Sequence, residues 1–584
     1  MKSRLLSTFA PGASFLLVWA AIIFATLPGS LPVPFRPALD GTPKALRNVP
    51  NTDVNPYGAN FFLQWEPEEW KVDRTLEMAR DAGLGWVKQH FPWEDIELKK
   101  GTFWNDQLNK STWEKYDRIV ALAQKYHLRI IARLDRPPDW TRKDNSRKEA
   151  PPDNFQDYAD FVEAVARRYK GKIQYYQLWN EPNIWPEWGN KPIDPAAYVN
   201  LLRVGYEAIK RADPDAYVLS APLAQTTENS PRAMEDLRYL EGMYKSGAKN
   251  YFDVFLANAY GFSSPPDDPP DPNVLNFQRV LLLRDIMVRN GDGDKPVWFN
   301  EFGWTAPPAG FPPDKLIWGS VTEQQQAEYT VAAIDKARAE WPWAGVFSIW
   351  YFRQDGHIPS DRADYYFRMV DVGFTPRPLY QAVKAKATSQ LRAMSAGDYQ
   401  ETNPAVVING NWHYKRDARA SGQGFLESCS PGDDLTITFR GTDLSLLLRK
   451  GPDAGLLYAS VDGGLIGKLP RDPQGRSYVD LYDSTEQWQS RAVVAEGLSN
   501  GEHKLRLVVG TDPRPAVSAN TSASGQCAAG GNLVVFDGFS VRDTPDWSLS
   551  GLLAVAGLLI VGILLLRWRR RSNLQKPAMP PENS

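Results

Sequence analysis

The feature of this chain that most restricts its fold is an alternation of short apolar runs and amphipathic helical patterns between about residues 55 and 385. Eight β-rich runs lie at residues 59–63, 85–91, 129–134, 173–179, 217–221, 254–260, 296–301 and 345–351. Strands that are each followed by a helix form a parallel sheet covered by helices. The eight units therefore predict an α/β fold, a (β/α)8 or TIM barrel with enlarged loops.

An open doubly wound sheet is the competing fold. Such a sheet usually carries a glycine-rich phosphate-binding turn after its first strand. Here the first run leads into Gln64-Trp65-Glu66-Pro67, which contains no glycine. The barrel is therefore the favoured interpretation.

Capping signals mark several of the helices. One helical pattern starts at Asn154 and stops at Gly171. A second has Asp194 as its N-cap, followed by Pro195 at the first helical position. A third opens with a capping box that begins at Thr322.

From about residue 393 the helical periodicity gives way to a two-residue alternation. Leu435, Ile437 and Phe439 alternate with threonines, and a tight turn is expected at Asp462-Gly463. This pattern predicts an antiparallel β-sandwich after the barrel.

Two glutamates end predicted strands of the barrel. Glu181 follows the fourth strand within Trp-Asn-Glu-Pro-Asn, and Glu301 ends the seventh within Phe-Asn-Glu-Phe-Gly-Trp. A carboxylate at the end of a buried strand is costly unless it is partnered or has a function. Because the carboxyl ends of barrel strands surround one hollow, we expect the two side chains to face each other. A facing pair of carboxyls is the arrangement that hydrolyses glycosidic bonds.

These motifs resemble those of the clan A glycoside hydrolases, over about residues 55–385. The most similar group is family 39, which contains β-xylosidases, α-iduronidases and exopolysaccharide glycosidases. The resemblance implies a retaining β-glycosidase that hydrolyses O-glycosidic bonds of a poly- or oligosaccharide, with Glu181 as acid/base and Glu301 as nucleophile. Lys88-Gln89-His90 stands where that family has Arg-x-His, so Lys88 departs from the pattern.

The resemblance also implies roles for residues around the pair. Asn180 is expected to hold the 2-hydroxyl of the sugar, Tyr260 to hydrogen-bond the nucleophile, and Trp350 to form a platform under the sugar. Further candidate substrate contacts in or near the carboxyl-end loops are His90, Lys88, Trp304 and Trp140.

Other kinds of chemistry find no support in the sequence. The five histidines are scattered and form no His-x-x-x-His pattern, and no P-loop or dinucleotide turn is present. Gly291-Asp292-Gly293-Asp294 lacks the downstream ligands of a calcium loop. We therefore predict no cofactor and no metal. The net charge of −2 gives no attraction to nucleic acid.

Two apolar stretches lie near the ends of the chain. Residues 13–27 follow Lys2 and Arg4, as in a signal peptide or a short N-terminal anchor, and residues 548–566 carry no charge and precede a basic cluster. This pattern predicts transmembrane segments that flank the folded domains, contact with membrane lipid, and localisation at the cell membrane with the catalytic domain on the extracytoplasmic side.

The expected organisation follows from these observations. It comprises a signal peptide or anchor (1–30), a linker (31–54), the barrel (55–390), the sandwich (391–545), a transmembrane helix (548–566) and a basic cytoplasmic tail (567–584). The sandwich resembles carbohydrate-binding modules, and a spacer role stays open. The two cysteines, Cys429 and Cys527, are expected to form a disulfide, with two buried free thiols as the alternative.

Two other functions stay open at this point. The chain is either a hydrolase as described, a non-catalytic carbohydrate-binding or surface protein on a glycosidase scaffold, or a transglycosylase of exopolysaccharide assembly. Because binding alone does not require a nucleophile, the presence of both glutamates favours the enzyme.

Overall fold

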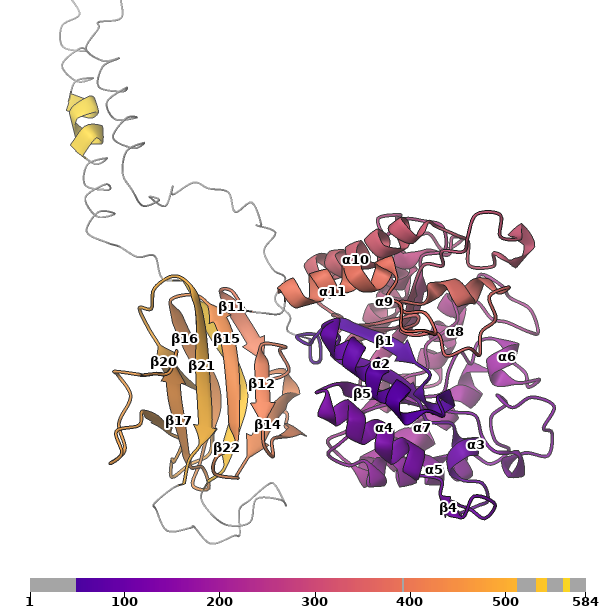
Figure 1. Ribbon diagram of the computed structural model, residues 1–584, viewed down its shortest axis with the longest axis horizontal. Helices are drawn as coiled ribbons and strands as arrows, with labels where there is room; N and C mark the ends of the chain where they lie inside the picture. The colour runs from indigo at the N-terminus through magenta and orange to yellow at the C-terminus, as the bar shows by residue number, and fades with distance from the viewer. Residues whose placement is uncertain (1–48, 391–392, 512–531, 544–559, 568–584) are drawn as a thin grey trace, which may run out of the picture. The chain divides into compact units, whose positions relative to one another are not determined.

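The computed structural model describes residues 49–390, 393–511, 532–543 and 560–567 (Figure 1). Residues from Ala45 to Asp543 form one compact unit, which contains a barrel and a β-sandwich. Of the other unit, Met1–Lys44 with Thr544–Ser584, only the helical residues 560–567 are described.

Eight parallel strands form the barrel. They are β1 (Tyr57–Phe61), β2 (Trp86–His90), β5 (Arg129–Leu134), β6 (Tyr175–Leu178), β7 (Tyr217–Leu219), β8 (Phe255–Tyr260), β9 (Val297–Gly303) and β10 (Ala344–Ile349). The strands pair in the order β7-β6-β5-β2-β1-β10-β9-β8. The ring closes where Leu219 bridges Val254 in parallel and Ser220 N donates to the carbonyl of Val254 at 3.1 Å. The predicted TIM barrel is confirmed, with a strand at each of the eight expected positions.

Helices follow the strands and cover the barrel (Figure 1). They are α2 (Glu69–Asp81), α3 (Trp93–Ile96), α4 (Glu114–Lys125), α5 (Phe155–Arg168), α6 (Trp185–Trp188), α7 (Pro195–Ala212), α8 (Asp236–Lys245), α9 (Val280–Arg289), α10 (Glu323–Glu340) and α11 (Pro378–Gln390). The side chains of Asn154 and Asp194 cap α5 and α7, and the capping box of Thr322 with Gln325 opens α10. These three helix starts agree with the sequence signals.

The sandwich consists of two antiparallel sheets. One contains β13 (His413–Arg416), β14 (Gly424–Ser428), β22 (Val534–Arg542), β16 (Asp443–Lys450) and β20 (Gln487–Ala495), with β11 (Gly397–Gln400) beside β22. The other contains β12 (Val406–Asn409), β15 (Asp434–Arg440), β21 (Glu502–Val509), β17 (Leu456–Val461) and β18 (Gly464–Leu465), with β19 (Tyr478–Asp480) beside β17. Asp462 and Gly463 both have positive φ, 51° and 75°, as the predicted tight turn requires. A short hairpin, β3 (Trp104–Asn105) with β4 (Lys110–Ser111), lies outside both sheets.

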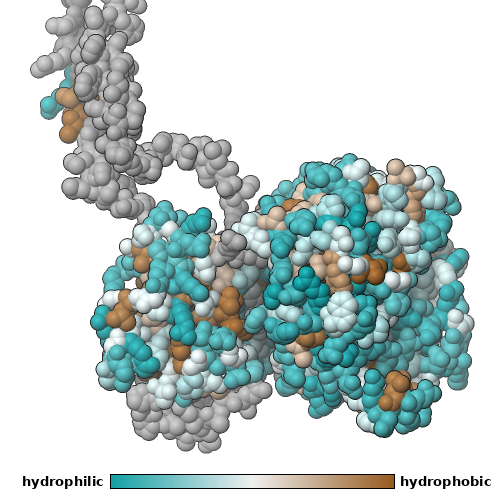
Figure 2. Space-filling view, in the orientation of Figure 1, coloured by the Kyte–Doolittle hydropathy of each residue, from teal (hydrophilic) through white to brown (hydrophobic). Residues whose placement is uncertain are grey.

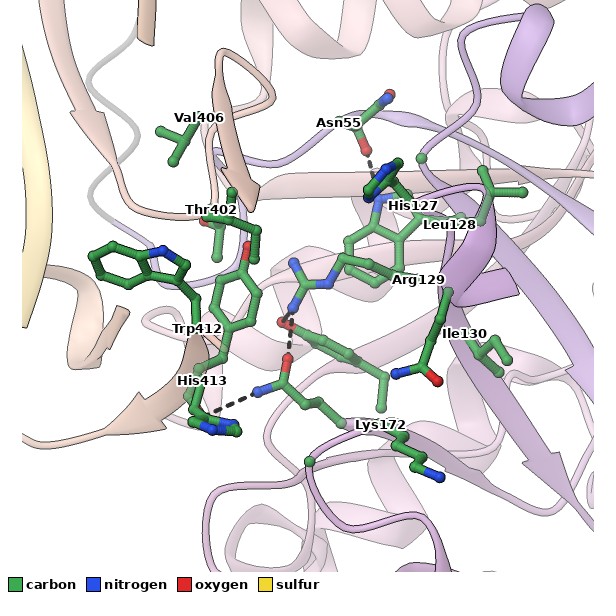
Figure 3. A pocket seen from close by; sticks show the side chains of 18 of the residues that line it. Asn55, His127, Leu128, Arg129, Ile130, Lys172, Thr402, Val406, Trp412 and His413 are labelled. Carbon is green, nitrogen blue, oxygen red and sulfur yellow. Dashed lines mark hydrogen bonds between the residues drawn. The ribbon is translucent and has the colours of Figure 1, made fainter. Parts of the chain in front are cut away.

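The sandwich contacts the amino-terminal end of the barrel strands. Lys415 pairs with Asp215 at 3.2 Å, and Arg416 pairs with Asp253 at 3.1 Å. A cavity of about 560 Å³ lies beside these contacts, with residues of both domains in its wall (Figure 3). Arg129, at the start of β5, points into it and lies against the rings of residues 86, 175 and 414.

Each domain has its own main hydrophobic core. The barrel core includes Phe299 and Phe347 from neighbouring strands, whose rings stack at 4.1 Å. The face of the molecule in Figure 2 is mostly hydrophilic, with small scattered apolar patches.

The predicted membrane localisation is wrong on the structure. Within residues 49–390, 393–511, 532–543 and 560–567, no helix combines the length and the apolar character needed to cross a bilayer. The first predicted segment, 13–27, lies outside the described residues, and so does the second apart from its end in the helical residues 560–567. The flanking transmembrane segments, and the contact with membrane lipid expected through them, are therefore unsupported.

Of the two cysteines of the predicted disulfide, only Cys429 belongs to the described residues. Cys429 is disulfide-bonded. Cys527, the partner predicted for it, lies outside the described residues.

Candidate active site

Glu181 lies in a tight turn directly after β6, the fourth strand of the barrel. Trp179 and Glu181 both have positive φ, 75° and 37°, which is uncommon for residues with a Cβ atom. The turn is fastened to the next loop, because Glu181 N donates to the carbonyl of Pro222 at 3.1 Å. Backbone conformations of this kind persist where the surroundings hold them, and they gather at functional sites.

The second asparagine of the Asn-Glu-Pro-Asn motif, Asn183, has a structural role. It is fully buried, and its amide donates to the carbonyls of Ala224 and Met234 while it accepts from Ala224 N at 2.8 Å. These bonds join the loop after β6 to the loop after β7. Asn183 thus fixes the loop that presents Glu181.

Glu301 lies within β9, the seventh strand, and is 6% exposed. Its two carboxylate oxygens have different partners. The hydroxyl of Tyr260, at the end of β8, donates to Oε2 at 2.9 Å, and Nζ of Lys88, on β2, donates to Oε1 at 3.2 Å. A neutral phenol and a charged ammonium from two separate strands thus hold this carboxylate in one orientation.

Asn258 links Glu181 to the strand beside Glu301, and no motif of the sequence marks it. It stands opposite Glu301 in the register between β8 and β9. Its amide nitrogen donates to Oε1 of Glu181 at 2.5 Å, and its oxygen accepts from the amide of Asn300 at 3.0 Å. The carboxyl of Glu181 is therefore held against the strand residue that neighbours Glu301.

The electrostatics of the two glutamates differ. Burial, and next the charge of Glu301, raises the pKa of Glu181 to about 8. Burial lowers the pKa of Lys88 to about 8, although the nearby Glu301 favours its charged form. Burial and the charges of both glutamates raise the pKa of Tyr260 well above its usual value, so the phenol stays a donor. At neutral pH this arrangement keeps a proton on Glu181.

A second cluster of charged residues lies at the carboxyl end of β5. It consists of Arg133 and Asp135 together with their partners His90 and Glu187. Asp135 accepts from Nε of Arg133 at 2.6 Å and is hydrogen-bonded to His90. Burial opposes the charge of Asp135, but Arg133 and His90 hold its pKa well below the usual range. Arg133 also lies 3.5 Å from Glu187, whose pKa burial raises to about 7. His90 is thus engaged with a carboxylate at the carboxyl end of β2, and burial lowers its pKa.

Aromatic residues line the rim beside the glutamates. Trp350, directly after β10, is half-buried and meets Phe62 edge-on at 5.6 Å. Phe62 stacks on Trp65 at 5.0 Å, and the indole of Trp65 is 38% exposed. Partly exposed rings of this kind offer apolar faces to a sugar.

Trp304 does not belong to this rim, which corrects the sequence-based expectation. Its indole is 1% exposed and donates to the carbonyl of Ser264 at 2.8 Å. The ring packs against Phe277 and Tyr329 in the barrel core. At 1% exposure, no face of Trp304 is free to contact a sugar.

Two further predicted contacts have polar or aromatic partners. Trp140 is half-buried, meets Trp93 edge-on at 5.6 Å and donates to the carbonyl of Glu97 at 3.1 Å. Asn180 is 3% exposed and accepts from the amide of Gln177 at 3.4 Å, a long contact. The roles of Trp140 and Asn180 toward a sugar stay predictions.

The site contains no arrangement for a metal in the part of the chain that the structure describes. Within that part, no group of three or more His, Cys, Asp or Glu side chains is placed to hold an ion. The chemistry available is that of paired carboxyls with amide, phenol and ammonium donors.

The chain was compared with known families, curated proteins and solved structures. No protein-family model and no curated protein matches the chain. Solved structures similar to it include a family 39 glycoside hydrolase from the gut symbiont Bacteroides cellulosilyticus WH2, with 17% identity, 79% of this chain and 81% of that chain covered, and a TM-score of 0.44.

Two other similar structures are a family 39 β-xylosidase from Caulobacter crescentus and a glucosidase from Croceicoccus marinus. The first has 13% identity, covers 80% of this chain and 97% of that chain, and has a TM-score of 0.42; the second has 12% identity, covers 79% and 96%, and has a TM-score of 0.44. All three are glycoside hydrolases, the class to which the sequence motifs pointed.

Proposed function

We propose that this chain is a retaining β-glycosidase that hydrolyses O-glycosidic bonds of a poly- or oligosaccharide, with Glu181 as acid/base and Glu301 as nucleophile. One observation carries the proposal. Two glutamates follow or end the fourth and seventh barrel strands and have different partners. Asn258, the cross-strand neighbour of Glu301, donates to Glu181, whereas Tyr260 and Lys88 donate to Glu301. Paired carboxyls in unlike environments are how one site provides both an acid and a nucleophile.

In the first step, Glu181 protonates the leaving oxygen while Glu301 attacks the anomeric carbon. The raised pKa of Glu181, about 8, supports its role as the acid near neutral pH. The donors Tyr260 and Lys88 orient the carboxylate of Glu301 and leave it little freedom to rotate away. The bond from carbon to the leaving oxygen breaks as the bond to Glu301 forms.

In the second step, water replaces the leaving group beside Glu181. Glu181 has lost its proton and now accepts one from the water, whose oxygen attacks the anomeric carbon. The bond to Glu301 breaks, and its carboxylate returns to Tyr260 and Lys88. The amide of Asn258 suits both states of Glu181, since an N–H donor interacts with a carboxyl oxygen before and after proton loss.

The rim aromatics support a carbohydrate substrate. Trp350 directly follows β10, and Phe62 and Trp65 follow β1, so all three present partly exposed rings at the carboxyl ends of barrel strands. Sugars have apolar faces that pack on such rings while their hydroxyls bind polar groups. Trp350 is the proposed platform under the sugar at the cleavage point.

The experiment is hydrolysis of a panel of aryl β-glycosides by the full chain, with the first-formed anomer followed by NMR. We expect release of the β-anomer from at least one glycoside. Release of the α-anomer would contradict the nucleophilic role of Glu301, and longer products in place of free sugar would favour transglycosylation. No turnover of any glycoside or oligosaccharide would favour a non-catalytic binder.

A further inference from the structure

A tryptophan on the loop that carries Glu181 lies between loops that each supply an arginine. Trp185, at the start of α6, is half-buried. The guanidinium carbons of Arg147 and Arg232 lie 4.3 and 4.4 Å from the centroid of its ring. Arg147 follows β5 and Arg232 follows β7, so three consecutive carboxyl-end loops meet at one indole.

Neither guanidinium has a hydrogen bond or an ion pair with any other described side chain, and both residues are exposed. This is unusual in the described part of a chain whose surface arginines mostly have acidic partners. The carboxylates of the same loops have other partners, which are Arg136 for Glu149, Arg133 for Glu187 and Ser230 for Glu228. Neither guanidinium therefore has an acidic partner among the described residues.

The chemistry of this cluster favours an anion. A guanidinium stacked on an aromatic face keeps its N–H groups at its edge, where they match a carboxylate or a sulfate in a bidentate way. Two positive charges at one indole also repel each other, and an anion bound at either guanidinium weakens that repulsion.

The cluster is held close to the acid of the proposed reaction. Ile184 N donates to the carbonyl of Glu181 at 3.2 Å, and Trp185 N donates to the carbonyl of Arg232 at 2.7 Å. Three residues separate Trp185 from Glu181, and the proton of Glu181 goes to the leaving group. A ligand at Trp185 therefore belongs to the leaving-group side of the cleavage point.

We propose that Arg147, Trp185 and Arg232 bind an anionic sugar on the leaving-group side, so that the substrate is an acidic glycan that carries uronate carboxylates or sulfate esters. The inference deepens the proposed glycosidase function and rests on it for the direction of the cleft. The binding of an anion by these three residues is measurable without turnover.

The test is calorimetric titration of the full chain carrying Glu301→Gln, which prevents turnover. The ligands are β-1,4-linked tetrasaccharides of glucose and of mannose, each compared with its tetrauronate and with its sulfated form. We expect at least one acidic form to bind about tenfold more tightly than its neutral counterpart, a preference that weakens as salt is raised. The uronate and sulfate arms distinguish the two sources of charge.

Added substitutions assign the preference to the cluster. Arg147→Gln and Arg232→Gln should each reduce it, and the double variant should abolish it, whereas Arg471→Gln should leave it unchanged. Arg471 is an exposed arginine of the sandwich and serves as the matched loss of one charge. Equal binding of acidic and neutral forms, absence of binding by all six, or the same loss with Arg471→Gln overturns the inference.

The proposed function is tested apart from this by hydrolysis of neutral aryl β-glycosides by the unsubstituted chain. Hydrolysis without a preference for acidic ligands removes only the anion site. A preference for acidic ligands without any hydrolysis removes the glycosidase proposal and keeps the anion site.

Discussion

The two ends of the barrel use charged residues in opposite ways. At the amino-terminal end, Arg129 is surrounded by the rings of Trp86, Tyr175 and Tyr414 at 4.6, 5.0 and 4.5 Å. At the carboxyl end, Glu181 and Glu301 are each held by one or two donors beside partly exposed rings. The first arrangement lines the cavity between the barrel and the sandwich with aromatic rings around a cation, while the second gives each carboxyl its own hydrogen-bond donors.

The comparison teaches that a buried carboxyl is not in itself a sign of chemistry. Glu401 and Asp537 in the sandwich are 5% and 0% exposed, and burial raises their pKa values to about 8 and about 7. Glu181 has the same shift for the same main reason, burial. What sets the carboxyl end apart is the pairing of two glutamates at strand ends with separate donors, which is the observation that carries the proposed function.

The largest expected difference between the two regions comes from matched Glu→Gln changes. Glu301→Gln removes the proposed nucleophile and should lower kcat by about 10⁴-fold or more. Glu401→Gln changes a carboxyl of similar burial outside the site and should leave kcat unchanged. Both are measured with an aryl β-glycoside under saturating conditions. Equal losses in the two variants, or a Glu301→Gln variant within tenfold of the parent, would remove the distinction.

The Glu401→Gln change, which should not affect kcat, should instead change the free energy of unfolding, and it should do so in a pH-dependent way. The folded-state pKa of Glu401 is raised to about 8 from 4.5, so the folded state holds a proton that the unfolded chain releases. Stability is therefore full below pH 4.5 and is lost as pH rises toward 8. Glu401→Gln should remove this loss and raise the free energy of unfolding by about 2–4 kcal/mol at pH 8, with little change at pH 4. Urea unfolding at the two pH values measures the difference, and an equal effect at both would contradict it.

The fold could be predicted from the sequence because each barrel strand is a short apolar run bounded by polar or turn residues. The runs at 129–134 and 254–260 agree with β5 and β8 almost to the residue. Helix starts could be predicted equally well, because caps such as Asn154 and Thr322 accept hydrogen bonds from backbone N–H groups only two or three residues further along the chain. Such short-range signals do not depend on how the domains pack.

The site was predictable only in part, for the opposite reason. Glu181 and Glu301 are marked by their place at strand ends, but Asn258 acts on Glu181 across 77 positions and carries no local signal. Trp304 follows Glu301 within the same motif, yet its ring fills the core beside Phe277. Large rings serve both a rim and a core, and only the path of the chain after the strand separates the two.

A smaller difference between the two ends of the barrel is expected from matched Tyr→Phe changes. Tyr260→Phe removes the hydrogen bond to Glu301 and should lower kcat/KM by about 10–100-fold, the range for a bond to a charged group. Tyr175→Phe is the matched change at the amino-terminal end, where the phenol accepts from Arg129 at 3.3 Å. It should affect the melting temperature and not kcat/KM. A similar kinetic loss in both variants would mean that Tyr260 acts only through stability.

The smallest expected effect is on the alkaline side of the pH profile. Glu181 must be protonated to act as the acid, and its pKa is raised to about 8, so kcat/KM should fall about tenfold for each pH unit above that value. Lys88 has a pKa lowered to about 8 and would lose its charge over the same range. Lys88→Arg separates the two, because arginine stays charged throughout. If the alkaline limb persists in Lys88→Arg, Glu181 sets it; if the limb moves to higher pH, the ammonium beside Glu301 sets it. A profile without any decline up to pH 10 would contradict the assignment of Glu181 as the acid.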